Sequence, residues 1–181
     1  MGSLTFEERE SMAKSKPAPR TVGASGGQNI SVVGDTYRIP ITGKETNGAF
    51  STMEFNVLPN GGPGPHSHAD FQESFYVAEG EVEVNSEAGS YTAGKGSFVT
   101  IPKGGIVHDF KNKTNQNTVI LCTVVPAGLE EFFVEIGKPV AIGEFLPPPP
   151  MDNPDAIKKM EELAEKHGQK VYPPDYLDHP A

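Results

Sequence analysis

The stretch Pro65-His66-Ser67-His68-Ala69-Asp70-Phe71-Gln72-Glu73 carries most of the structural information in this sequence. His66 and His68 are two positions apart, so both imidazoles project from one face of an extended strand. Glu73 follows five positions after His68, an odd offset that one regular strand cannot present on that face. A turn at 69–70 solves this by delivering Glu73 from the next strand. We therefore expect two short strands whose imidazoles and carboxylate converge, as the ligands of a divalent transition metal do.

Overall composition restricts the class of protein. The 181 residues suffice for one domain with a hydrophobic core. The net charge of -9 makes a nucleic acid or an anionic membrane surface an unfavourable partner. No apolar run approaches the roughly 18 residues that span a bilayer, and the start has no signal-peptide pattern, so we expect a cytoplasmic protein. The single cysteine, Cys122, stands in an apolar run, which predicts a buried, inert thiol.

The chain divides into three parts. Residues 1–28 are polar and interrupted by proline and glycine, which predicts a flexible N-terminal arm. Residues 29–127 alternate between short apolar segments and turn signals, the pattern of an all-β sandwich or barrel. The expected strands include 30–33, 36–41, 50–58, 73–78, 81–85, 98–101, 108–111 and 118–125.

Residues 128–181 predict a helical extension. Residues 128–136 have the pattern of a short helix that stops at Gly137. A second helix is expected with Pro154 in its first turn and Gly168 at its end. We expect this extension to pack on the barrel or on a second subunit.

Alternation within the strands predicts an apolar lining next to the metal ligands. Met53 and Phe55 share one face of their strand, and Phe75 lies on the same face as Glu73. His108 and Phe110 form a similar inward pair. Met53, Phe55, Phe75 and Phe110 are therefore candidate substrate contacts, although such residues are more often simple core.

Two spaced motifs resemble the signature motifs of the cupin family. The first is His66-x-His68, four residues, Glu73, six residues and Gly80; the second runs from Gly96 through Pro102 and His108 to Asn112. One extra residue follows Pro102, which a bulge could absorb. The resemblance implies a cupin jelly-roll β-barrel with short C-terminal helices and one metal bound by His66, His68, Glu73 and His108. Such ligands suit Mn, Fe, Co, Ni, Cu or Zn and leave two positions open on a six-coordinate ion.

The strings around 66–77 and 126–133 are similar to those of bacterial single-cupin quercetin (flavonol) dioxygenases. This similarity implies O2-dependent ring cleavage of a small aromatic substrate, with Glu73 both as a metal ligand and as the general base that deprotonates the flavonol 3-hydroxyl. Two alternatives stay open: a non-catalytic metal-binding module that binds a small molecule, and a metal-assisted isomerase. By analogy of fold, we also expect a homodimer.

Overall fold

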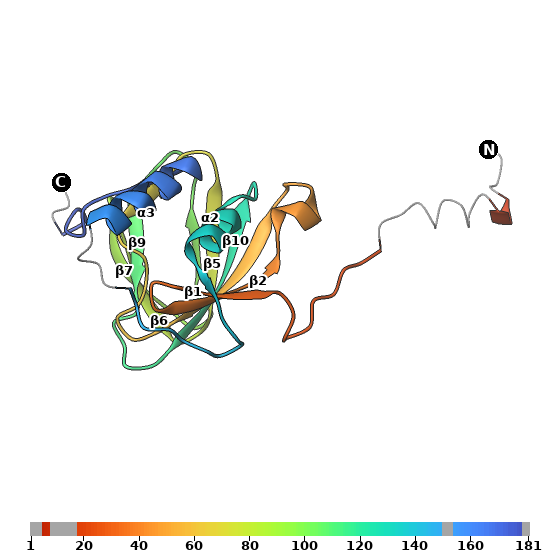
Figure 1. The fold of residues 1–181 in the computed structure, drawn as a ribbon, viewed down its shortest axis with the longest axis horizontal. Helices are drawn as coiled ribbons and strands as arrows, with labels where there is room; N and C mark the ends of the chain where they lie inside the picture. Colours follow the sequence, from red (N-terminus) through yellow and green to blue (C-terminus); the bar gives the residue numbers. More distant parts are fainter. Residues whose placement is uncertain (1–4, 8–17, 150–153, 179–181) are drawn as a thin grey trace.

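Two antiparallel sheets form the body of the protein in the computed structural model, which describes residues 5–7, 18–149 and 154–178 (Figure 1). The larger, sheet A, has the strand order β11-β1-β2-β3-β10-β5-β8. Its strands are β1 (Gln28–Val32), β2 (Asp35–Ile41), β3 (Ser51–Val57), β5 (Gln72–Glu79), β8 (Phe98–Ile101), β10 (Thr118–Val125) and β11 (Lys138–Pro139).

Sheet A is held in register by its central strand, β10. This strand pairs with β3 from Thr118↔Val57 to Val124↔Ser51, and on its other side with β5. Burial alternates strictly along β3, so that Met53 and Phe55 point inward as the sequence predicted. Buried apolar side chains of both sheets form one core cluster. The all-β jelly-roll prediction is thus confirmed.

The smaller sheet, sheet B, has the order β12-β4-β9-β6-β7. Its strands are β4 (His66–His68), β6 (Glu81–Ser86), β7 (Gly89–Gly94), β9 (His108–Lys111) and β12 (Gln169–Val171). Strand β4 meets β9 at one position, His66↔His108, but pairs with all three residues of β12. Neither β7 nor β12 was among the expected strands, because both are too polar to show a strand pattern.

The helical extension contacts both sheets. Helix α2 (Leu129–Ile136) lies within the expected range 128–136 and begins one residue later, after Gly128. The Glu130 carboxylate accepts hydrogen bonds from the backbone N–H of Gly128 (2.8 Å) and of Gly43 (2.6 Å), which ties α2 to the 3-10 helix η1 (Gly43–Thr46). Helix α3 (Pro154–Lys166) leads through Gly168, at φ 76°, into β12.

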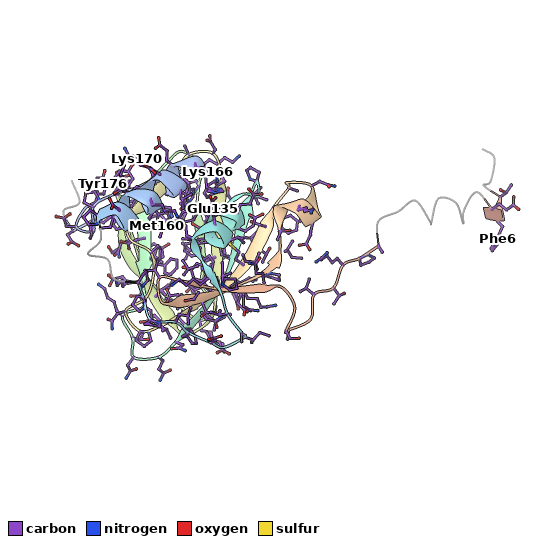
Figure 2. The ribbon with its side chains drawn as sticks, viewed as in Figure 1. Phe6, Glu135, Met160, Lys166, Lys170 and Tyr176 are labelled. Atoms are coloured by element: carbon purple, nitrogen blue, oxygen red, sulfur yellow. The ribbon has the colours of Figure 1, made fainter. Side chains whose placement is uncertain are left out.

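Glu135 links the two helices (Figure 2). Lys166 Nζ lies 2.7 Å and His167 Nε2 2.8 Å from Glu135 Oε2. The His167 side chain is only 11% exposed, because the turn that follows α3 folds it against α2 near Phe132. No helix among the described residues has the length and hydropathy needed to cross a membrane.

Residues 1–4 and 8–17, half of the arm predicted over 1–28, lie outside the described residues. The described part, red in Figure 1, leads away from the sheets. Arg20 forms an ion pair with Glu45, and Arg38 Nη1 donates to the Gly26 carbonyl at 3.2 Å. Within residues 18–149, the first strand is β1, which begins at Gln28.

Candidate metal centre

Three strands bring the four predicted ligands together. His66 and His68 come from β4, Glu73 from β5 and His108 from the first position of β9. Each residue offers one ligand atom, and these atoms all lie within 4.8 Å of one another. The predicted turn at 69–70 is present as a bend, but β4 and β5 do not pair with each other. The chain instead crosses from sheet B to sheet A at this bend, so Glu73 faces the imidazoles across the barrel.

One carboxylate oxygen lies among the imidazoles. Glu73 Oε2 is 3.4 Å from His68 Nε2 and 3.5 Å from His108 Nε2. The His66 and His108 ring centroids are 4.3 Å apart, so the third imidazole closes the group. His68, Glu73 and His108 are buried, whereas His66 is half-buried. The site therefore approaches solvent on the His66 side.

Backbone carbonyls fix the proton on each imidazole. His66 Nδ1 lies 3.0 Å from the Gly64 carbonyl, His68 Nδ1 2.9 Å from that of Phe71, and His108 Nδ1 3.1 Å from that of Ile106. A carbonyl oxygen can only accept, so each Nδ1 carries the hydrogen and each Nε2 keeps a free lone pair. This arrangement, with the far ring nitrogen donating to a backbone carbonyl, is typical of metal-binding histidines.

The convergence of lone pairs fits a cation. Three Nε2 lone pairs and a carboxylate oxygen face one another, and His108 Nε2 is buried without a hydrogen-bond partner in the described chain. Such a buried, electron-rich group is unfavourable unless something positive satisfies it. His66, His68, Glu73 and His108 could therefore hold one divalent metal ion, and the donor set leaves its identity open.

Electrostatics keep the ligands in their metal-binding forms. Burial lowers the pKa of His66 to about 4, and His108 adds to this effect, so its imidazole is neutral at pH 7. Burial raises the pKa of Glu73, and hydrogen bonds donated by the Nε2 atoms of His108 and His68 lower it, with a net shift below its ordinary value. When these Nε2 atoms carry lone pairs instead, a bound cation would keep the carboxylate ionised in the same way. Glu73 is thus an anion and a weak base.

Phe71 supports one of these ligands. Its ring stacks on His68 with a centroid distance of 4.2 Å and an interplanar angle of 17°, and its carbonyl accepts the His68 Nδ1–H. The ring and the carbonyl together fix the orientation of His68. The sequence pattern did not single out Phe71, because a residue between a bend and a strand carries no periodic signal.

Cys122 touches the second oxygen of the carboxylate. Its Sγ donates to Glu73 Oε1 at 3.1 Å, and both side chains are buried. The thiol was expected to be buried and inert; its burial is confirmed, but its contact with Glu73 was missed. Burial raises the pKa of Cys122, and Glu73 raises it further, so the group is a neutral S–H donor. Strand alternation alone could have placed Cys122 inside the barrel.

Gln169 brings a polar group from β12. It lies opposite His68 in the pairing of β12 with β4, so the two side chains share a face of sheet B. The side chain is buried, and its Nε2 has no hydrogen-bond partner within the described residues. Strand β12 thus places an amide donor without a partner among the described residues beside a candidate metal ligand.

The four predicted substrate contacts are core residues in this structure. Met53, Phe55, Phe75 and Phe110 are each 4% exposed or less. The Phe110 ring packs against Phe75 at 5.6 Å and against Phe55 at 6.4 Å between centroids. They form an apolar wall around the barrel interior, and contact with a substrate stays a prediction.

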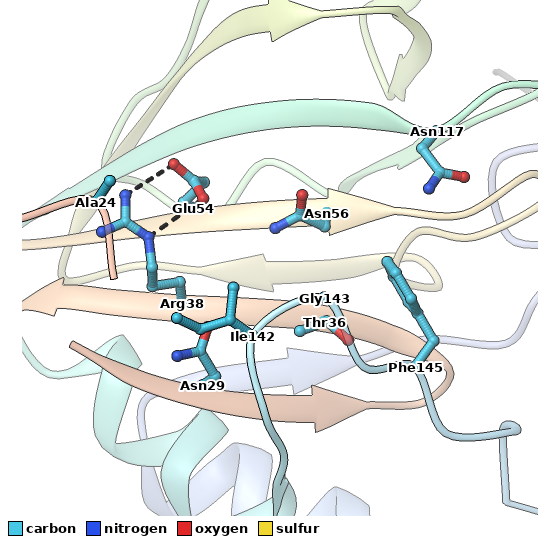
Figure 3. A pocket seen from close by; sticks show the side chains of 10 residues that line it. All are labelled: Ala24, Asn29, Thr36, Arg38, Glu54, Asn56, Asn117, Ile142, Gly143 and Phe145. Atoms are coloured by element: carbon cyan, nitrogen blue, oxygen red, sulfur yellow. Dashed lines mark hydrogen bonds and ion pairs between the residues drawn. The ribbon is translucent and has the colours of Figure 1, made fainter. Parts of the chain in front are cut away.

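A separate polar pocket of about 230 Å³ lies on the outer face of sheet A (Figure 3). Arg38 contacts both carboxylate oxygens of Glu54 there, at 3.2 and 2.9 Å. Arg38 and Glu54 alternate with the inward residues of β2 and β3, so the sheet separates this pocket from Glu73. No predicted ligand lines it.

Comparison with known proteins supports a cupin fold. Residues 53–124 match the family model described as a cupin domain. A predicted oxalate decarboxylase from Thermotoga maritima has a TM-score of 0.54 at 16% identity, covering 59% of this chain and 99% of that one. Ectoine synthase from P. lautus has a TM-score of 0.50 at 19% identity, covering 72% and 89%. At these identities the similarity concerns the fold.

A sugar phosphate isomerase from a cupin superfamily of Silicibacter pomeroyi is 19% identical, with a TM-score of 0.47. The match covers 52% of this chain but only 61% of that protein. The search of curated proteins gave no match. The cupin-domain match over residues 53–124 and the two antiparallel sheets together identify the fold of this chain as the cupin jelly roll.

Proposed function

We propose that the protein is a metal-dependent dioxygenase that opens the ring of a flavonol-type substrate. The observation that carries the proposal is the orientation of the four ligands. Three Nε2 lone pairs and Glu73 Oε2 converge, while the Nδ1 protons point away to backbone carbonyls. A divalent metal bound there would supply Lewis acidity and sites for dioxygen and for a substrate oxygen.

The basicity of Glu73 restricts the substrate. A carboxylate whose pKa is lowered removes protons only from relatively acidic groups. The 3-hydroxyl of a flavonol, or another enolic or phenolic hydroxyl, meets this condition, whereas an aliphatic alcohol does not. In the proposed reaction, Glu73 accepts that proton and the apolar surroundings exclude water.

The barrel interior favours a planar, uncharged ring. Its wall consists of apolar side chains such as Phe75 and Phe110. No lysine or arginine in the described ranges is buried, so the interior offers no fixed cation to a phosphate or carboxylate group. Gln169 could donate to an oxygen of the bound substrate from its position beside His68.

The test is to load the protein separately with Mn, Fe, Co and Ni and to mix each form with quercetin in air. We expect at least one form to consume flavonol and dioxygen and to release carbon monoxide. Glu73→Gln should abolish this turnover, whereas Glu135→Gln, an exposed glutamate between α2 and α3, should not. Full turnover in Glu73→Gln would refute the proposed base.

Two other outcomes would replace the proposal. Tight flavonol binding without turnover in every metal form would identify a binding module. Conversion of an enolisable substrate without dioxygen consumption would identify an isomerase.

A further inference from the structure

The two oxygens of Glu73 have different partners. Oε2 faces the imidazoles, with His68 Nε2 at 3.4 Å and His108 Nε2 at 3.5 Å, while Oε1 accepts a hydrogen bond from Cys122 Sγ at 3.1 Å. The carboxylate therefore presents only one oxygen to the metal centre. The other oxygen, Oε1, is hydrogen-bonded to the Cys122 thiol and does not face the metal centre.

Strand register explains why the thiol is at this point. Cys122 lies in β10 between Met53 of β3 and Phe75 of β5, and each of the three is 1% exposed or less. The inward residues on either side of it in β10 are Ile120 and Val124, which cannot donate a hydrogen bond. The buried Thr118 hydroxyl on the same face donates to the Glu81 carbonyl instead, so Cys122 is the side chain of this face that donates to Glu73.

The thiol is placed as a supporting group, not as a ligand. The group of ligand atoms within 4.8 Å of one another contains Glu73 and the three histidines but not the Cys122 sulfur. The Sγ lies behind the carboxylate, on the Oε1 side. Without this donor, Oε1 would be a buried acceptor with no other hydrogen-bond partner in the described structure, free to turn toward the metal.

We propose that Cys122 is a positioning residue that holds Glu73 as a one-oxygen metal ligand through an S–H···Oε1 hydrogen bond. The inference rests on the metal site of the proposed function but not on the reaction or the substrate. Each histidine is oriented by a backbone carbonyl that accepts a hydrogen bond from its Nδ1, the ring nitrogen that points away from the metal site. In the same way, Cys122 of β10 would orient Glu73 by donating to Oε1, the carboxylate oxygen that points away from the site. A coordination position that a two-oxygen carboxylate would occupy is thereby kept open.

The experiment titrates the metal-free full-length protein with Co(II) alone and follows the ligand-field absorption bands, which report coordination number and geometry. Cys122→Ser keeps a donor and should retain the wild-type spectrum and affinity within about threefold. Cys122→Ala and Cys122→Val remove the donor and should weaken Co(II) binding about tenfold or more, with an altered spectrum. Cys122→Val keeps the volume filled, so the result does not depend on the alanine variant being stable.

Val124→Ala is the matched control. Val124 is equally buried, lies on the same face of β10 and pairs directly with Glu73, but it donates nothing. It should change Co(II) affinity by less than about threefold and leave the spectrum intact, because it loses packing without losing an orienting hydrogen bond.

Each alternative result has one meaning. If the alanine and valine variants of Cys122 match Val124→Ala in affinity and spectrum, Cys122 is only packing and the inference is overturned. A sulfur-to-cobalt charge-transfer band in the wild type would show that Cys122 is a ligand and would also overturn it. If the wild type binds no Co(II), the metal site itself fails, and the proposed function fails with it. Absence of flavonol cleavage would leave this inference intact.

Discussion

The two sheets of the barrel contribute to the candidate site in opposite ways. Sheet A has long strands in continuous register, and β10 alone pairs over seven positions with β3. Sheet B supplies all three histidines, yet its strand β4 is three residues long and meets β9 at one position. The three candidate histidine ligands thus lie on the sheet with the shorter strands and the less continuous pairing.

The two sheets position the residues of the candidate site by different interactions. In sheet A, cross-strand register and tight packing fix Glu73 and Cys122. In sheet B, hydrogen bonds from each Nδ1 to a nearby carbonyl fix the imidazoles one by one. We therefore expect core substitutions in sheet A that do not contact Glu73 to change mainly stability, and substitutions of the histidines in sheet B to change mainly metal binding.

The largest expected effect is on stability and comes from Phe55→Ala in sheet A. Phe55 is 2% exposed and contacts the rings of Tyr37 (4.1 Å) and Phe110 (6.4 Å). Removing the ring should lower the free energy of unfolding by about 3–5 kcal/mol, measured by urea denaturation of the metal-free protein. The Co(II) affinity of the folded molecules should change less than about threefold. A large loss of Co(II) affinity in Phe55→Ala would show that core packing in sheet A also sets metal affinity, against this prediction.

His68→Ala in sheet B should have the converse effect. Loss of one ligand should weaken Co(II) binding by at least about 100-fold, or about 2.7 kcal/mol. Substitution of a residue that only orients a ligand typically weakens metal binding by about 10- to 100-fold, so the expected loss equals or exceeds the largest of those effects. Isothermal titration calorimetry measures the affinity. His167→Ala serves as the control, because His167 contacts Glu135 and not the ligand group. Wild-type affinity in His68→Ala would remove His68 from the metal site.

A smaller, pH-dependent effect is expected at Asp35, which joins sheet A to the loop that leads into β4. Its carboxylate accepts hydrogen bonds from the backbone N–H of Leu58 (2.9 Å) and Gly62 (3.0 Å). Burial raises the pKa of Asp35 to about 6, despite these bonds and the charge of Lys111. Folding therefore favours the protonated form, and that stabilisation is complete below about pH 3.8 and lost as the pH rises through about 6.

The measurement compares wild type with Asp35→Asn, which cannot titrate, by urea denaturation of the metal-free proteins. The stability advantage of the wild type over the variant should fall by about 2 kcal/mol between about pH 4.5 and pH 7.5. The exposed Asp175→Asn serves as the control and should show no comparable trend. An advantage that grows with pH would reverse the sign of the pKa shift.

The sequence predicted those parts of the site that local patterns encode. The spacing of His66 and His68 placed both on one strand face, and the odd offset of Glu73 required a second strand; both inferences are confirmed. The helix over 128–136 and its end at Gly137 were also predicted from local signals, and α2 matches them to within one residue. Each of these depends on residues within a few positions of one another.

Contacts between distant segments could not be predicted in this way. The bond from Cys122 to Glu73 depends on the register of β10 against β5, which no single-strand pattern fixes. Strand β12 shows no alternation of its own and exists because β4 offers it an edge. The same holds for Gln169, whose position beside His68 follows from that pairing alone.

The pairing of β4 with β12 also has a consequence for biosynthesis. The strand that carries His66 and His68 gains its most extensive partner only when residues 169–171 have been made. During translation, the first two ligands are on the growing chain long before the segment that completes their sheet leaves the ribosome. A metal that binds here would therefore meet a completed sheet B only after β12 has been made, and a chain interrupted after β10 would carry the three histidines on a sheet B that lacks β12 at its edge.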